Sequence, residues 1–64
     1  MKVNGKAVAA ADGITVRTLL NQLDYPATRI AVEVNGSIVP RAQHETYVLH
    51  DADTIEIVCF VGGG

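Results

Sequence analysis

Apolar and polar residues alternate in two short runs at the start of the chain, residues 1–3 and 6–8, and Asn4 and Gly5 lie between the runs. Asn-Gly between alternating runs is a strong hairpin signal, because a type I′ turn requires positive φ at both of its central residues. Residues that lie opposite each other in a hairpin share one face of the sheet. The side chains predicted on the core side of this hairpin are Met1, Val3 and Val8.

A helical spacing of apolar residues follows the hairpin. Thr15 is placed to act as the helix N-cap, with its hydroxyl accepting a hydrogen bond from a free backbone N–H. Pro26 disfavours helical geometry at the residue before it, so we expect the helix to end near Asp24. The apolar residues at the i, i+3, i+4 and i+7 positions of one helix face are Val16, Leu19, Leu20 and Leu23.

Alternation returns after the helix and predicts a second hairpin. Residues 30–34 alternate between branched apolar side chains, which should point inward, and smaller or charged ones. Asn35 and Gly36 predict a turn into a short strand at residues 37–39. Pro40 lacks a backbone N–H, so it closes that strand at an edge of the sheet.

The rest of the chain contains one long strand, predicted at residues 54–61. Residues 41–53 are polar and mixed, and we interpret them as turns with one helical turn and a possible short strand at residues 47–49. This order of elements is typical of an α+β domain, in which one helix packs on a mixed sheet of about four to five strands. The first and last strands could pair at the sheet centre. The predicted organisation is one domain at residues 1–61 and a flexible glycine tail at residues 62–64.

Composition and charge exclude several classes of protein. The chain has 64 residues and a net charge of −2, and its charges are interspersed without the basic stripe of a nucleic-acid binder. No apolar run approaches the roughly 20 residues of a membrane span, and the first residues lack the regions of a signal peptide. Cys59 is the single cysteine, which excludes an intramolecular disulfide. We therefore expect a cytoplasmic protein that binds neither nucleic acid nor membrane.

The two faces of the predicted last strand differ in what they can contact. Alternation places Ile55, Ile57 and Cys59 on one face, which is expected to meet the helix. Val58 and Phe60 then lie on the solvent face beside the glycine tail. An exposed apolar patch often marks a partner site, although isolated apolar residues on a surface carry no such meaning. We predict partner binding at Val58 and Phe60, and we expect Cys59 to pack in the core instead of acting as a nucleophile.

The polar stretch before the last strand contains both histidines of the chain, His44 and His50, close to Asp51 and Asp53. Their spacing does not match paired zinc ligands, so we expect a surface loop and no metal site. No Ser-His-Asp or paired-carboxylate arrangement is placed for catalysis in so small a domain. The sequence thus predicts a protein that is not an enzyme, has no catalytic residue and binds no cofactor of its own.

The chain ends in three glycines, Gly62, Gly63 and Gly64. Because they lack a Cβ, these residues are narrow and adopt almost any backbone conformation. Such a tail could pass through a narrow channel and present the carboxylate of Gly64 to chemistry inside another protein. A carboxylate is a poor electrophile and requires activation, typically by ATP to an acyl-adenylate. The alternative is a frayed or artificial end without function.

Three stretches of the chain form a pattern that belongs to one protein family. The first is Val32-Glu33-Val34-Asn35-Gly36 followed by Ile38-Val39-Pro40-Arg41, and the other two are Asp53-Thr54-Ile55-Glu56-Ile57-Val58 and Phe60-Val61-Gly62-Gly63-Gly64. In these stretches the chain resembles the thiamine-biosynthesis sulfur carriers, within the ubiquitin-like β-grasp superfamily. The resemblance spans essentially the whole chain. One departure is Ala52, where the family usually has glycine. Because alanine tolerates positive φ poorly, this turn either uses another conformation or strains Ala52.

The resemblance implies a β-grasp fold and a specific chemistry at the tail. Such carriers are adenylated at the last glycine by a ubiquitin-activating-like adenylyltransferase that uses ATP and Mg²⁺. Sulfur from a cysteine persulfide, supplied by a cysteine desulfurase or a persulfide protein, replaces the adenylate and gives a thiocarboxylate, which passes its sulfur to thiazole synthase. Carried over to this chain, Gly64 bears the adenylate and the thiocarboxylate. Val58 and Phe60 then help to dock the activating enzyme.

Three other roles remain open at the level of the sequence. The small subunit of molybdopterin synthase, or a carrier for another sulfur pathway, would share the tail chemistry, so the tail does not discriminate. A β-grasp interaction module would have an inert tail and would tolerate a tag at its C-terminus. A protein-conjugating modifier would form isopeptide-linked species. The short chain and the Val34-Asn35-Gly36 motif favour the thiamine branch.

Overall fold

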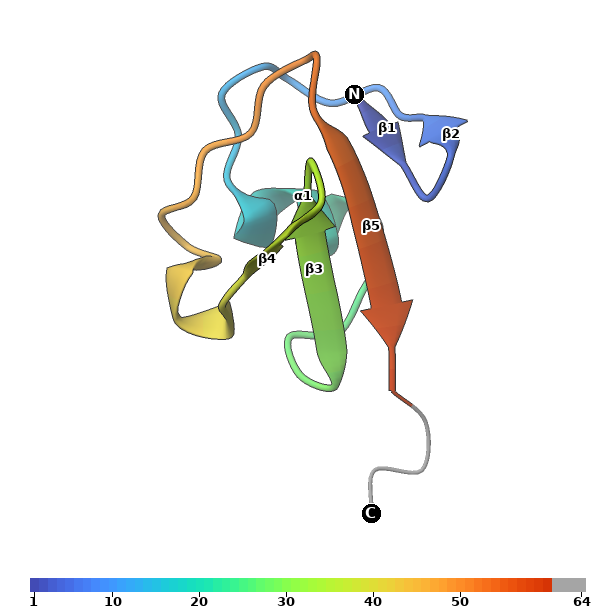
Figure 1. The fold of residues 1–64 in the computed structure, drawn as a ribbon. Coiled ribbons are helices and arrows are strands. Elements are labelled where there is room, and N and C mark those ends of the chain that lie inside the picture. Colours follow the sequence, from blue (N-terminus) through green and yellow to red (C-terminus); the bar gives the residue numbers. More distant parts are fainter. Residues whose placement is uncertain (61–64) are drawn as a thin grey trace.

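Five strands form one mixed sheet in the order β2-β1-β5-β3-β4, and a short α-helix packs against it (Figure 1). The computed structural model describes residues 1–60, so the predicted strand end at Val61 and the tail at residues 62–64 lie outside the described residues. The predicted α+β class, with a sheet of four to five strands on one main helix, is confirmed. The elements are β1 (Lys2–Val3), β2 (Lys6–Ala7), α1 (Val16–Gln22), β3 (Ile30–Val34), β4 (Ser37–Val39), the 3-10 helix η1 (Arg41–Gln43) and β5 (Thr54–Cys59).

The last strand of the chain occupies the centre of the sheet. β5 pairs in parallel with β1, where Val3 lies opposite Ile55. On its other side β5 pairs antiparallel with β3, where Val32 lies opposite Ile57. β4 closes one edge of the sheet and is followed directly by Pro40. The predicted central pairing of the first and last strands and the edge strand before Pro40 are both confirmed.

Both Asn-Gly pairs form the predicted hairpin turns. Asn4 and Gly5 have φ angles of 51° and 82°, and Asn35 and Gly36 have φ angles of 52° and 86°. Positive φ at both central residues is the geometry of a type I′ turn. Each turn therefore sets the register of its hairpin, β1 with β2 and β3 with β4.

Helix α1 begins at the residue that its cap and apolar spacing predict. The Thr15 hydroxyl accepts a hydrogen bond from the Thr18 backbone N–H at 3.2 Å. Leu23 caps the C-terminal end and is half-buried. A helix of this length gains its stability mainly from the packing of its apolar face. The fully buried residues of that face are Val16, Leu19 and Leu20.

The core lies between α1 and one face of the sheet, and in Figure 1 the helix is behind β3 and β5. Every second residue of β3 points into this core, as the alternation predicts. Leu49 adds a fully buried side chain from the segment before β5. The buried apolar residues are Val3, Val16, Leu19, Leu20, Ile30, Val32, Val34, Val39, Leu49, Ile55 and Ile57.

The surface position predicted for His44 is wrong. Only 1% of its surface is exposed, and its Nε2 atom lies 3.1 Å from the carbonyl oxygen of Val39. The chain after η1 turns back against the start of the helix, where the Arg17 N–H donates to the His44 carbonyl oxygen at 2.8 Å. The backbone carbonyl of Val39 pairs with one ring nitrogen, whereas the buried Nδ1 has no hydrogen-bond partner among the described residues. His50 is exposed, as predicted.

The segment that leads into β5 is less regular than a strand. The possible strand at residues 47–49 is reduced to a single bridge between Val48 and Thr15. Ala52 is not one of the residues with positive φ in the described part of the chain. The turn before β5 therefore uses a conformation that alanine tolerates, and Ala52 is not strained.

Candidate functional site

β5 carries the backbone from the sheet centre toward the predicted modification site. Its pairing with β3 continues to Cys59, which lies opposite Ile30. One residue further, the Phe60 N–H donates to the Arg29 carbonyl oxygen at 2.7 Å. The backbone is thus hydrogen-bonded to its neighbour up to the last described residue. The predicted site residues outside the described part are Gly62, Gly63 and Gly64.

The two faces of β5 differ in solvent exposure, as the alternation predicts. Ile55 and Ile57 are 0% and 6% exposed and pack under the helix. Val58 and Phe60 are 52% and 55% exposed. The predicted solvent position of Val58 and Phe60 is therefore confirmed, and their role in partner binding stays a prediction.

The core position predicted for Cys59 is wrong, because its side chain is exposed. Cys59 pairs with Ile30, the first residue of β3, at the end of the sheet. Figure 1 shows this end of β5 extending past α1. Alternation determines which side of the sheet a residue faces, but it does not determine whether another element covers that side.

The exposed side of the sheet carries more apolar surface than sequence reasoning found. Ile38 on β4 is 65% exposed and lies opposite Glu33, so it shares a face with the outward residues of β3 and β5. The two-residue turn before β4 fixes this register and could have indicated Ile38 in advance. We define the outer face as Ala31 and Glu33 of β3, Ile38 of β4, Glu56 and Val58 of β5, and Phe60.

Asn4 binds β5 in a way that the hairpin pattern does not indicate. Its Oδ1 accepts from the Ile57 N–H at 2.7 Å, and its Nδ2 donates to the Ile57 carbonyl oxygen at 3.2 Å. The side-chain amide thus takes the place of a strand neighbour beyond the end of β1. Asn35 acts similarly at the start of β5, where its Oδ1 accepts from the Thr54 N–H at 3.0 Å. An Asn-Gly motif predicts the turn, but only the topology reveals which strand the amide meets.

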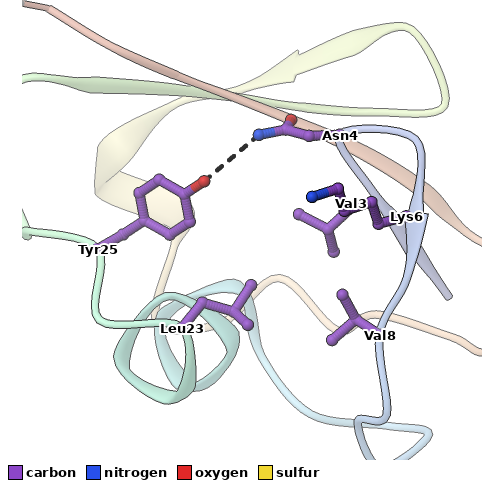
Figure 2. A pocket seen from close by; sticks show the side chains of 6 residues that line it. All are labelled: Val3, Asn4, Lys6, Val8, Leu23 and Tyr25. Atoms are coloured by element: carbon purple, nitrogen blue, oxygen red, sulfur yellow. Dashed lines mark hydrogen bonds between the residues drawn. The ribbon is translucent and has the colours of Figure 1, made fainter.

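A hollow of about 310 Å³ lies beside Asn4, between the first hairpin and the end of α1 (Figure 2). The Asn4 Nδ2 lies 3.3 Å from the hydroxyl oxygen of Tyr25 across this hollow. The lining contains no carboxylate, histidine or cysteine, so it offers none of the usual metal ligands. The residues that line it are Val3, Asn4, Lys6, Val8, Leu23 and Tyr25.

Asp53 fixes the turn that leads into β5. Its carboxylate accepts hydrogen bonds from the His50 backbone N–H at 2.9 Å and from the Asn35 Nδ2 at 3.0 Å. These two bonds, the His50 bond first, hold the pKa of Asp53 below its ordinary value of 3.8. The charged carboxylate therefore contributes to the stability of the folded protein.

The described residues contain few features suited to other kinds of site. Within residues 1–60 no three side chains of His, Cys, Asp or Glu gather to hold a metal ion. The His50 Nδ1 lies 3.7 Å from the Asp12 Oδ1, and both side chains are exposed, so this pair contributes little. In the same part of the chain, no helix has the length and apolar character needed to cross a membrane.

Comparisons of the sequence and of the fold with known proteins show which family the chain belongs to. The ThiS family model matches residues 1–64, the whole chain. The chain belongs to the ThiS family. Sulfur carrier protein ThiS of Escherichia coli (strain K12) is 38% identical to it over 61 residues, which cover 95% of this chain and 92% of that protein. The crystal structure of the thiamine biosynthesis protein ThiS from Geobacter metallireducens matches with a TM-score of 0.79 and 33% identity, covering 98% of this chain and 96% of that one.

The solved structure also confirms the predicted ubiquitin-like β-grasp fold for this ThiS family chain. A further relative is much longer. Thiazole synthase of Paramagnetospirillum magneticum (strain ATCC 700264 / AMB-1) is 37% identical over 62 residues, which cover 97% of this chain and 19% of that protein. That thiazole synthase therefore contains a ThiS-like segment as about a fifth of its length.

Proposed function

We infer that this ThiS family chain is a sulfur carrier protein of thiamine biosynthesis. The observation that carries the inference is the family match over residues 1–64, because it includes the glycine end together with the folded part. The protein acts as a carrier on which other enzymes work, and not as a catalyst. The exposed thiol of Cys59 fits a reducing compartment, so we place the carrier in the cytoplasm.

The sulfur is carried at the carboxyl group of Gly64. An activating adenylyltransferase joins this carboxylate to AMP, using ATP and Mg²⁺ and releasing pyrophosphate. The terminal sulfur of a cysteine persulfide, supplied through a cysteine desulfurase, then attacks the acyl carbon and releases AMP. A thiol cleaves the resulting S–S bond, becomes part of a disulfide and leaves the thiocarboxylate on Gly64. Gly62 and Gly63 supply the narrow approach that this chemistry needs, since neither has a Cβ.

The acceptor of the sulfur is thiazole synthase. This proposal is supported by the relative of that name, in which a segment similar to this chain belongs to the same polypeptide. The same relative favours the thiamine pathway over molybdopterin synthesis, which would use identical chemistry at the tail. A thiocarboxylate sulfur is softer and more nucleophilic than a carboxylate oxygen, so the carrier delivers sulfur without releasing free sulfide.

Val58 and Phe60 contribute to docking of the activating enzyme. Both side chains are more than half exposed although they are large and apolar. Val58 lies on β5 and Phe60 directly follows that strand, so a partner that contacts them meets the chain within six residues of the reacting carboxylate in sequence. Aromatic and aliphatic side chains that lose water on association supply much of the energy of such contacts.

Reconstitution tests this function directly. The carrier is incubated with the activating enzyme, Mg-ATP and a persulfide donor, and its intact mass is measured. We expect an increase equal to the difference between one sulfur and one oxygen atom. A variant that lacks Gly63 and Gly64 is the control and should remain unchanged. An unchanged mass of the full chain, or an increase that survives the deletion, would contradict the proposal.

A further inference from the structure

The two Asn-Gly pairs that form the hairpin turns are also chemically reactive sequences, Asn4-Gly5 and Asn35-Gly36. The backbone nitrogen of the glycine attacks the side-chain amide carbon of the asparagine, because no Cβ on the glycine hinders the approach. A new C–N bond closes a five-membered succinimide as the amide C–N bond breaks, and the amide nitrogen leaves with the glycine proton as ammonia. Water then opens the ring at the side-chain carbonyl to give aspartate, or at the backbone carbonyl to give isoaspartate.

The two pairs have the same backbone geometry, so their turns alone do not distinguish them. The asparagine φ angles are 51° and 52°, and the glycine φ angles are 82° and 86°. A Cβ placed on either glycine would meet no atom within 4 Å outside the adjacent residues, so both turns are open to water. The hydrogen bonds of each asparagine side chain therefore determine how often its amide is free to react.

The amide of Asn4 is held by groups inside the sheet. Its two hydrogen bonds to the Ile57 backbone, at 2.7 and 3.2 Å, are both partly buried. A third contact joins its Nδ2 to the Tyr25 hydroxyl at 3.3 Å (Figure 2). Release of this amide leaves the Ile57 N–H and carbonyl without partners in a partly buried place, which is costly. Asn4 is therefore protected in the folded protein.

The amide of Asn35 is held only by exposed groups at the start of β5. Its Oδ1 accepts from the Thr54 N–H at 3.0 Å, and its Nδ2 donates to the Asp53 Oδ1 at 3.0 Å. Both hydrogen bonds are exposed, so water replaces them at little net cost when the side chain turns away. The Asn35 amide therefore opens to the Gly36 nitrogen more often than the Asn4 amide opens to Gly5.

We propose that Asn35 is a site of spontaneous deamidation in the folded protein, and that the product weakens the attachment of the β3–β4 turn to β5. The new carboxylate lies where an amide donor met the Asp53 carboxylate, so two like charges replace a hydrogen bond. An isoaspartate would also lengthen the backbone of the turn by one carbon. This inference concerns the stability of the protein over time and does not depend on the proposed sulfur chemistry.

The test is peptide mapping by mass spectrometry after incubation of the purified full chain in mildly alkaline buffer. Conversion replaces an amide NH2 by OH, and the two asparagines fall in different peptides. We expect conversion at Asn35 about fivefold faster than at Asn4, the factor that one additional hydrogen bond supplies. In urea the two rates should be equal, because both sequences are Asn-Gly. Equal rates in the folded protein, faster conversion at Asn4, or no conversion at Asn35 while the unfolded chain converts would overturn the proposal.

A second variant separates local opening from global unfolding. Asp53→Ala removes the acceptor of the Asn35 Nδ2, so it should accelerate conversion at Asn35 and leave conversion at Asn4 unchanged. Asp51→Ala is the matched control, because Asp51 is an exposed neighbouring carboxylate, and it should change neither rate. Equal acceleration of both sites in Asp53→Ala would show that they react only after global unfolding, which overturns the assignment of a local site at Asn35.

The consequence of the modification is tested with the aspartate product made directly. Asn35→Asp should have a lower urea midpoint at neutral pH than wild type, because its carboxylate faces Asp53. Gln43→Glu adds the same charge at an exposed position outside the sheet and is the control, with a midpoint close to wild type. A midpoint of Asn35→Asp equal to that of Gln43→Glu would overturn the proposed weakening of the turn.

Discussion

The two halves of β5 follow the same alternation of inward and outward side chains, but they differ in their neighbours and in their burial. The first half, residues 54–57, is paired with β3 on one side, while β1 and the Asn4 amide bind it on the other. The second half, residues 58–60, has a described neighbour only on the β3 side and extends past α1 (Figure 1). Inward residues of the first half are buried, whereas Cys59, the inward residue of the second half, is exposed.

This difference separates the residues that stabilise the fold from the residues that are exposed to a partner. Burial of Ile55 and Ile57 joins the sheet to the helix, so the first half of β5 holds the fold together. The second half contributes little to the core, and its exposed apolar side chains are free to meet another protein. Substitutions in the first half should therefore change the free energy of unfolding, and substitutions in the second half should change partner binding.

The largest effect is expected at Ile55, which is fully buried at the centre of the sheet. Ile55→Ala removes apolar contacts and leaves a cavity, so it should lower the free energy of unfolding by about 3 kcal/mol. Val58→Ala is the matched change in the other half, and it should alter that free energy by less than about 0.5 kcal/mol. Urea denaturation followed by circular dichroism measures both. Equal losses in the two variants would contradict the division of β5.

The next largest effect is expected at Asn4, whose amide joins the first hairpin to Ile57. Asn4→Gly retains the positive φ of the turn but removes both hydrogen bonds to Ile57 and the one to the Tyr25 hydroxyl, so it should cost about 1–2 kcal/mol. Asn4→Ala loses the same bonds and also strains the turn, at about 1 kcal/mol more. Hydrogen exchange at the Ile57 amide should accelerate in both variants. A glycine variant as stable as wild type would mean that the amide does not hold β5.

A smaller effect on the stability of the fold, which depends on pH, is expected at Asp53. Its pKa is lower in the folded protein than its ordinary value, so its charged form stabilises the fold above that value. This contribution is lost as the pH falls through the lowered pKa of the folded state. The difference in stability between wild type and Asp53→Asn should therefore be present at pH 6 and shrink below about pH 4. Urea midpoints across this range provide the measurement, and a difference that is independent of pH would refute the role of the charge.

The smallest effect is expected at Cys59, because its side chain is exposed at the end of the sheet. Cys59→Ser should change the free energy of unfolding by less than about 0.5 kcal/mol. The sulfur loading of Gly64 should also be unchanged, since the sulfur travels on the carboxyl carbon. Loss of loading in a folded Cys59→Ser protein would show instead that this thiol takes part in the transfer.

Local patterns predicted most of the fold because they depend on neighbours in the sequence. The Asn-Gly turns, the Thr15 cap and the inward residues of β3 all follow from spacing and backbone geometry. The errors at His44 and Cys59 have another origin, because their burial depends on which distant element covers them. The amide of Asn4 was missed for the same reason, since it binds a residue 53 positions away.

The residues of the candidate site also differ in how far the sequence alone predicts them. Val58 and Phe60 could be predicted from alternation along one strand. Ile38 and the opposition of Glu33 and Glu56 require the register of three strands, which the sequence indicates only in part. The chemistry assigned to Gly64 comes from the family likeness and not from any packing, so it needs its own experiment.

The most direct experiment measures the intact mass of the carrier recovered from thiamine-producing cells. In cells that contain the activating enzyme, we expect part of the protein to be heavier by the difference between sulfur and oxygen. Fragmentation should place the change on the peptide that ends in Gly64, and cells without the activating enzyme should yield only the lighter form. An unaltered terminus in both kinds of cell, or sulfur found only on Cys59, would contradict the claim that Gly64 carries the sulfur.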